Sequence, residues 1–303
     1  MIEVEHVTKS FGRKPVLNDV SFSVRPGQVY GLIGYNGVGK TTLLKIVSGI
    51  YRPDKGCIKN DGEIAYENPA VKKKCFLMTE EVTFFPQATL EDMRKFYRGY
   101  YHTWSDEVYQ QLLQVFGIPK DIRISSFSKG MQRQAGLILA FSTGVTTLFL
   151  DEAFDGLDYS MRCLMKEMIR GYVKIRNAMI LISSHNLQEL EDLADCIGML
   201  NNGELIFDNT TTYMRQQYQR CGFQTEEEEQ IRACARLIHL EPEESGWSCI
   251  IKGTKEQAFE LLEQMNVSNI QVRPIRLEEF FEVERNVKHV DWEKVFRADR
   301  NQA

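Results

Sequence analysis

Residues 34–41 read GYNGVGKT and match the pattern G-x-x-x-x-G-K-[ST] at every fixed position. A short apolar run at residues 29–33 (VYGLI) comes directly before them, and residues 40–50 carry apolar side chains at helical spacing. Glycines let such a loop bend so that successive backbone N–H groups point at phosphate oxygens, and the N-terminus of the following helix adds a positive field. The order of strand, glycine loop and helix predicts an α/β fold with a phosphate-binding loop.

Two side chains of this loop have separate predicted roles. The Lys40 ammonium can reach the β- and γ-phosphates of a nucleoside triphosphate, and the Thr41 hydroxyl can ligate Mg²⁺. The other predicted nucleotide contacts are Gly34, Tyr35, Asn36, Gly37, Val38, Gly39 and Thr42. The chain has no N-K-x-D guanine motif, so ATP is favoured over GTP, with Mg²⁺ as the metal.

A second, acidic motif follows at residues 147–152 (TLFLDE), where a buried apolar strand is predicted to end in two carboxylates. In an open α/β sheet the ligand crevice lies at the carboxyl ends of the strands, so Asp151 and Lys40 can converge on one nucleotide. Asp151 would then orient the metal, and Glu152 could polarise the attacking water. A solvated acidic turn is the alternative for this motif taken alone.

Residues 126–132 (SFSKGMQ) lead into a helical pattern over residues 133–141. Ser128 is a good N-cap residue, so its hydroxyl and the Gly130 N–H could present a second helix terminus to a γ-phosphate. This stretch resembles the signature of the ATP-binding cassette (ABC) family, usually written LSGGQ, with Ser128 and Gly130 retained and Lys129 and Met131 departing from it. A capped surface helix is the alternative.

Further motifs follow the order of the same family. Residues 155–158 (DGLD) resemble the loop through which two cassettes communicate, and His185 resembles the switch histidine that bonds the γ-phosphate. Phe11 stands where the family places an aromatic that stacks on adenine, although a core residue at a strand end is the alternative. Glu80 takes the place of a glutamine that binds the metal through its carbonyl, and glutamate there could ligate Mg²⁺. Gln87 is a later candidate for that glutamine.

The resemblance covers residues 2–208 and implies a mainly parallel sheet core, a small N-terminal antiparallel β subdomain and a helical subdomain. After Asp208 the character of the sequence changes, so we predict an ATP-binding domain at residues 1–208 and an accessory α+β domain at residues 209–303. Residues 275–281 (IRLEEFF) resemble the end of the accessory domain on cassettes that serve bacterial exporters, with an ordinary amphipathic helix as the alternative. Strands are predicted at residues 247–252 and 270–272, and helices at residues 255–265 and 277–284.

Composition limits the cellular setting. The 43% hydrophobic content excludes disorder for most of the chain, and a formal net charge of −5 argues against nucleic acid as a partner. Seven cysteines without a C-x-x-C pair indicate a reduced, cytoplasmic protein. No apolar run approaches the roughly 18 residues of a membrane-spanning helix.

Together, the resemblance implies the ATP-binding and ATP-hydrolysing subunit of a membrane ABC transporter, powering translocation, in the export direction, by a separate integral membrane permease. Such subunits work as a homodimer or heterodimer of two cassettes, peripheral on the cytoplasmic face of the cell membrane. The region around Glu80 and the aromatic segment 84–104 would form a groove for the permease, although a helical core would claim at least half of these aromatics. The alternative function is a soluble cassette ATPase that acts on ribosomes or DNA without a permease.

Overall fold

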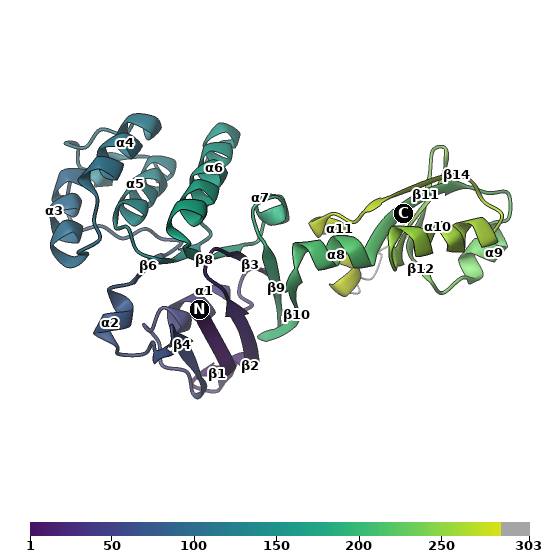
Figure 1. The fold of residues 1–303 in the computed structure, drawn as a ribbon, viewed down its shortest axis with the longest axis horizontal. Helices are drawn as coiled ribbons and strands as arrows, with labels where there is room; N and C mark the ends of the chain where they lie inside the picture. Colours follow the sequence, from purple (N-terminus) through teal and green to yellow (C-terminus); the bar gives the residue numbers. More distant parts are fainter. Residues whose placement is uncertain (286–303) are drawn as a thin grey trace, which may run out of the picture. The chain divides into compact units, whose positions relative to one another are not determined.

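The structure is a computed structural model that describes residues 1–285, with side chains up to Val283. It divides into two compact units, residues 1–211 and the residues from Thr212 onward (Figure 1). This boundary lies three residues beyond the predicted one, because strand β10 (Glu204–Thr210) continues past Asp208. The part of the predicted second domain after residue 285 lies outside the described residues.

The first unit is built on a six-stranded sheet with the order β10-β9-β3-β8-β7-β6. Strands β9, β3, β8, β7 and β6 run parallel to one another, and the edge strand β10 pairs antiparallel with β9. Besides β10, the strands are β3 (Val29–Ile33), β6 (Cys75–Met78), β7 (Thr147–Asp151), β8 (Met179–Ser184) and β9 (Cys196–Asn201). The predicted α/β class with a mainly parallel core is confirmed.

The strand order brings three chain segments to one edge of this sheet. Strand β8 lies between β3 and β7, with Ile33 paired to Ser184 and Asp151 paired to Ser183. The residues that follow these strands therefore emerge side by side at the carboxyl edge. They begin the glycine loop, the Glu152 segment and the His185 segment.

A four-stranded antiparallel sheet and a set of helices complete the first unit. The sheet has the order β2-β1-β4-β5, with β1 (Ile2–Phe11), β2 (Lys14–Val24), β4 (Lys55–Asn60) and β5 (Glu63–Ile64). The helices are α1 (Lys40–Val47), α2 (Pro69–Lys72), α3 (Leu90–Tyr100), α4 (Asp106–Phe116), α5 (Lys129–Ser142), α6 (Tyr159–Arg176) and α7 (Leu187–Glu191), with a 3₁₀ turn at Ile124–Ser126. In Figure 1, α3 to α6 form a helical layer apart from the antiparallel sheet.

Residues 90–116 form two separate helices, α3 and α4. Each has its own N-cap, since the Thr89 hydroxyl accepts a bond from the Asp92 N–H and the Ser105 hydroxyl accepts one from the Val108 N–H. Gly117, in the left-handed conformation, ends α4.

The second unit has a four-stranded antiparallel sheet in the order β12-β13-β11-β14. Its elements are α8 (Thr211–Gln217), β11 (Tyr218–Gln224), α9 (Glu228–Ala233), β12 (Leu237–Glu243), β13 (Gly246–Lys252), α10 (Lys255–Gln264), β14 (Ser268–Pro274) and α11 (Leu277–Arg285). The core of this unit includes Phe223, Trp247 and Leu262. Among residues 1–285, no helix is both long and apolar enough to cross a bilayer.

Candidate functional site

The glycine loop joins β3 to α1, and Gly39 is the N-cap residue of that helix. Gly39 has φ 111°, which strains any L-residue with a side chain, and a Cβ there would lie 3.0 Å from the Val16 carbonyl oxygen, a tight contact. No side chain caps α1. The N–H groups of its first turn therefore need another acceptor, and phosphate oxygens are suitable acceptors at a helix N-terminus.

Lys40 is almost fully buried, with 5% of its surface exposed. Its Nζ donates to the carbonyl oxygens of Gly34 at 2.7 Å and Tyr35 at 3.2 Å, and lies 3.2 Å from Glu152 Oε1. The ammonium is thus held within the loop by two dipoles and one carboxylate. These are partners that a triphosphate can replace, since it offers stronger acceptors in the same loop.

Thr41 and Asp151 meet at the base of the loop. The Thr41 hydroxyl donates to Asp151 Oδ2 at 2.7 Å, and the Ser183 hydroxyl donates to Asp151 Oδ1 at 2.5 Å. Asp151 is 1% exposed, so these two bonds fix its carboxylate. A hydroxyl and a carboxylate side by side are the hard oxygen donors that Mg²⁺ prefers, and the residues fit that ion.

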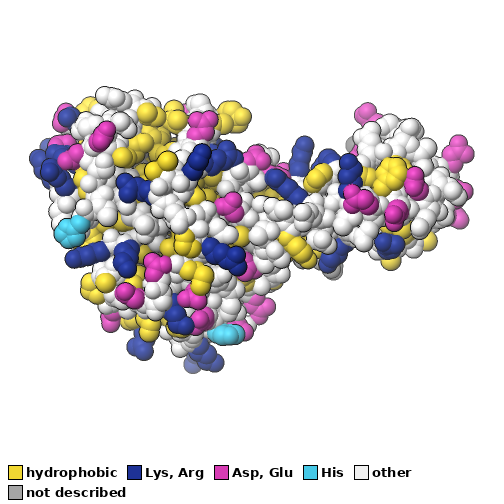
Figure 2. Space-filling view, in the orientation of Figure 1, with side chains coloured by type: hydrophobic (Ala, Val, Ile, Leu, Met, Phe, Trp, Pro, Cys, Tyr) yellow, Lys and Arg dark blue, Asp and Glu magenta, His cyan; other side chains and the backbone are white. Residues whose placement is uncertain are grey.

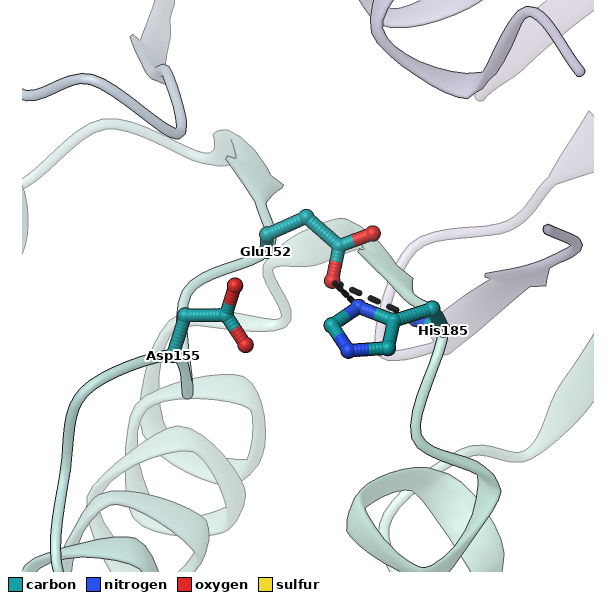
Figure 3. A group of neighbouring side chains, drawn as sticks. All are labelled: Glu152, Asp155 and His185. Carbon is teal, nitrogen blue, oxygen red and sulfur yellow. Dashed lines mark hydrogen bonds and ion pairs between the residues drawn. The ribbon is translucent and has the colours of Figure 1, made fainter. Parts of the chain in front are cut away.

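Glu152, Asp155 and His185 form a group whose ligand atoms all lie within 4.8 Å of one another (Figure 3). Glu152 Oε2 accepts hydrogen bonds from His185 Nδ1 at 2.8 Å and from the His185 backbone N–H at 3.2 Å. The backbone of Glu152 is left-handed, with φ 46°. Its N–H donates to the carbonyl oxygen and the hydroxyl oxygen of Ser183, and these bonds hold that conformation. Two carboxylates and an imidazole can bind a divalent cation, or they can accept and donate a proton.

A cavity of about 490 Å³ opens beside the phosphate loop. Of the predicted site residues, those lining it are Phe11, Asn36, Gly37, Gly39, Lys40, Thr41, Thr42, Glu80 and Glu152. Phe11 is 48% exposed and contacts Tyr51 edge-on, with ring centroids 5.7 Å apart. Gly34, Tyr35 and Val38 belong to the loop but do not line the cavity. Lys14 and Val16 do line it, and no motif in the sequence marks them.

Ser128 and Gly130 lie at the start of α5, away from the cavity of their own phosphate loop. The Ser128 hydroxyl accepts a bond from the Met131 N–H at 3.2 Å and so caps the helix. A Cβ on Gly130 would lie 2.8 Å from the Gly156 carbonyl oxygen, so the DGLD loop requires glycine at this position. Within one chain, the structure does not bring Ser128 and Gly130 together with Lys40.

Arg133 is a buried cation near this site that sequence reasoning missed. Its Nη1 donates to the carbonyl oxygens of Thr79 at 3.4 Å and Asp151 at 3.5 Å. Burial lowers the pKa of its guanidinium, while nearby carboxylates favour the charged form. Arg133 therefore ties α5 to the ends of β6 and β7.

Comparisons with known proteins agree with this geometry. A sequence profile described as ABC transporter matches residues 17–155. The chain is 27% identical over 283 residues to the ABC transporter ATP-binding protein YtrB of Bacillus subtilis, covering 93% of this chain and 97% of that protein. It is 30% identical over 228 residues to the ABC-type transporter ATP-binding protein EcsA of the same organism, covering 72% of this chain and 90% of EcsA.

A solved structure titled "Structure of ATP binding subunit of ABC transporter" superimposes with a TM-score of 0.65 at 27% identity, covering 71% of this chain and 92% of that one. The resemblance drawn from the motifs is confirmed: the chain belongs to the family of ABC transporter ATP-binding proteins.

Proposed function

We propose that this chain, the ATP-hydrolysing subunit of a membrane ABC transporter, converts ATP binding into closure of a dimer of two cassettes and so drives export by a separate permease. The observation that carries the proposal is the Glu152 carboxylate, 5% exposed and held by His185 at 2.8 Å beside the phosphate loop. The rival function on ribosomes or DNA is set aside, because the matched relatives are transporter subunits.

In the proposed binding mode, Phe11 stacks on adenine while the loop N–H groups and Lys40 bind the phosphates. Thr41 and Asp151 would hold Mg²⁺, with the exposed Glu80 as a further carboxylate at the cavity. Mg²⁺ bound there would neutralise charge on the phosphates. Glu152 accepts the proton of the attacking water as the general base. Its two hydrogen bonds from His185 hold the carboxylate in the orientation that this step requires.

The hydrogen bond between His185 and Glu152 fixes which ring nitrogen faces the carboxylate. A carboxylate can only accept, so the Nδ1 of His185 carries the hydrogen that it shares with Glu152 Oε2. In the proposed binding mode, Nε2 is the ring nitrogen left to bond a γ-phosphate oxygen.

The dimer is supported by the position of Ser128 and Gly130 at the start of α5, where they do not line the cavity of their own phosphate loop. In a head-to-tail pair, homodimeric or heterodimeric, these residues would reach the γ-phosphate bound by the other cassette. The second unit would act as the accessory domain, and the complex would lie on the cytoplasmic face of the cell membrane. No nucleic-acid partner is proposed.

The proposed permease contact is the aromatic surface of the helical layer. Hydrophobic side chains reach the surface over this layer (Figure 2). Of the aromatics in residues 84–104, Phe85, Phe96 and Tyr100 are 51%, 48% and 40% exposed. The other aromatics of the segment, such as Tyr101, are buried or half-buried. A cavity of about 230 Å³ is lined by Phe84 and Tyr97 of this segment and by residues of β6.

The test is Glu152→Gln, which keeps the shape of the side chain and removes its basicity. Turnover should fall at least ~100-fold, as expected for loss of a general base, and Mg²⁺ with ATP should shift the protein to a dimer in size-exclusion chromatography with light scattering. Glu244→Gln, an exposed carboxylate of the second unit, is the matched control and should match the unmodified protein. Hydrolysis retained by Glu152→Gln would show that Glu152 is not the general base. A Glu152→Gln protein that binds ATP and stays monomeric would contradict dimer closure.

A further inference from the structure

Helix α7 begins just after His185, with Asn186 as its N-cap residue. Three basic side chains of α6 contact this helix. Arg162, Lys166 and Arg170 are spaced four residues apart and share one face of α6. Lys166 Nζ donates to the Gln188 carbonyl oxygen at 2.9 Å, and Arg170 donates to the carbonyl oxygen of Asp192, the C-cap of α7. Positive charge at a helix C-terminus is stabilising, so this face of α6 fixes the position of α7.

Glu189 on α7 is the buried centre of this contact. Its side chain is 4% exposed, and Arg162 Nη1 lies 3.3 Å from its Oε1. Its Oε2 accepts a hydrogen bond from the Ser184 hydroxyl at 2.6 Å. Burial raises the pKa of the Glu189 carboxyl above its ordinary value, because removal from water disfavours the charged form. The hydrogen bond from Ser184 and the charge of Arg162 oppose this effect by stabilising the carboxylate.

Ser184 transmits this contact to the residue beside it, His185. Since its hydroxyl has one hydrogen and the carboxylate is the closer acceptor, Ser184 donates to Glu189 and accepts from the Asn186 N–H at 2.9 Å. The backbone is thereby held on both sides of His185.

Arg162 has a second contact, to the segment that carries Glu152. Its Nε donates to the Leu157 carbonyl oxygen at 3.0 Å, in the DGLD loop between Glu152 and α6. In Figure 3, Glu152 and Asp155 come from that segment, whereas His185 comes from the segment after β8. One guanidinium therefore bonds the Glu152 segment and, through Glu189 and Ser184, the His185 segment.

We infer that Glu189 and Arg162 are positioning residues for ATP hydrolysis, which set the placement of His185 against Glu152. The inference rests on the proposed roles of Glu152 and His185. Neither positioning residue lines the phosphate-loop cavity, so their loss changes the turnover number and leaves ATP affinity intact. A displacement of about 1 Å at a reacting group can cost ~100-fold in rate, and a partial loosening costs less.

The test is Glu189→Gln, with Glu167→Gln, an exposed carboxylate on α6, as the matched control. The kcat for ATP should fall about 10-fold in Glu189→Gln while KM stays within about twofold, and the control should change neither. Arg162→Met should give a similar loss, and the double variant a loss no larger than either single one, because both residues act in one network. If Glu189→Gln fails to fold, Ser184→Ala tests the same connection by removing one hydroxyl.

A spectroscopic readout separates positioning from general destabilisation. The chain has five histidines, so the ring-nitrogen signals of His185 can be assigned in ¹⁵N-histidine-labelled protein by their loss in His185→Ala. These signals should shift in Glu189→Gln and stay in place in Glu167→Gln. An unchanged kcat, or a raised KM at unchanged kcat, would overturn the inference. If Glu152→Gln abolishes turnover at the same time, only the positioning role fails, whereas turnover retained by Glu152→Gln refutes the proposed function itself.

Discussion

The two units differ in whether they bury charged side chains. The first unit encloses five charged side chains, each at most 8% exposed: Lys40, Arg133, Asp151, Glu152 and Glu189. In the second unit, as far as residue 283, the buried polar side chains are Gln219 and Ser248, both neutral. Removing an ion from water costs several kcal/mol before its partners compensate. The first unit therefore accepts that cost at the phosphate-loop cavity, which Lys40 and Glu152 line, and among the residues around it.

The charges of the second unit serve a different purpose. Arg273 donates to Glu279 through its Nη1 and Nη2, at 2.9 and 2.5 Å, and so connects β14 to α11. Burial alone would raise the pKa of Glu279, but the hydrogen bonds from Arg273 and the Arg276 N–H lower it below the ordinary value. Glu279 remains 20% exposed, so this pair fastens a strand to a helix near the surface.

The largest effect should come from removing the buried cation of the first unit. Lys40→Met should lower ATP turnover by ~100-fold or more, because no other ammonium is held within the loop to stabilise the phosphates. Lys252→Met, an exposed lysine of the second unit, is the control and should stay within about twofold. The measurement is steady-state hydrolysis alongside calorimetric ATP binding. Turnover above a tenth of the original in Lys40→Met would mean that the buried charge serves folding rather than catalysis.

A smaller effect is expected from the histidines. His185→Ala should lower kcat roughly 10-fold, because Glu152 loses its side-chain donor, while ATP binding is spared. His239→Ala, at a half-buried histidine in β12, should leave turnover unchanged. Nucleotide titration and single-turnover hydrolysis distinguish the two steps. Loss of ATP binding in His185→Ala would show that His185 supports the structure of the binding site rather than the hydrolysis step. It would also weaken the assignment of the first unit's buried charges to hydrolysis.

The smallest effect on turnover should follow damage to the core of the second unit. Leu262 is fully buried there, so Leu262→Ala should lower the free energy of unfolding of this unit by about 2–5 kcal/mol. Hydrolysis per folded molecule should stay within about twofold, since no charge used in catalysis is buried in that core. Urea denaturation followed by circular dichroism measures the first quantity. A tenfold loss of hydrolysis below the unfolding transition would show that the second unit takes part in catalysis.

The phosphate loop could be predicted because its chemistry is contiguous in the sequence. Backbone N–H groups, lysine and threonine stand in one eight-residue motif between a strand and a helix. Arg162 and Glu189 form no such motif. They lie on different helices, and only the packing of α7 against α6 makes them partners. Local patterns contain no information about such a pair.

The second unit was harder to predict for a local reason. Helix α8 ends at Gln217 and β11 begins at Tyr218, with no glycine or proline between them to mark the change. Residues 226–229 are four consecutive glutamates without apolar spacing, and Glu228 and Glu229 form the first turn of α9, where negative charge favours a helix. The strands and helices predicted from residue 247 onward have clearer apolar spacing, and the structure has β13, α10, β14 and α11 there.

Gly39 has a thermodynamic consequence for the whole first unit. Because this residue offers α1 no side-chain cap, a triphosphate bound as proposed would cap the helix, and nucleotide binding would be thermodynamically linked to folding. A ligand present at 100 times its dissociation constant adds about 2.7 kcal/mol to the stability of the fold that binds it. The melting temperature of the first unit should therefore rise with the concentration of added ATP.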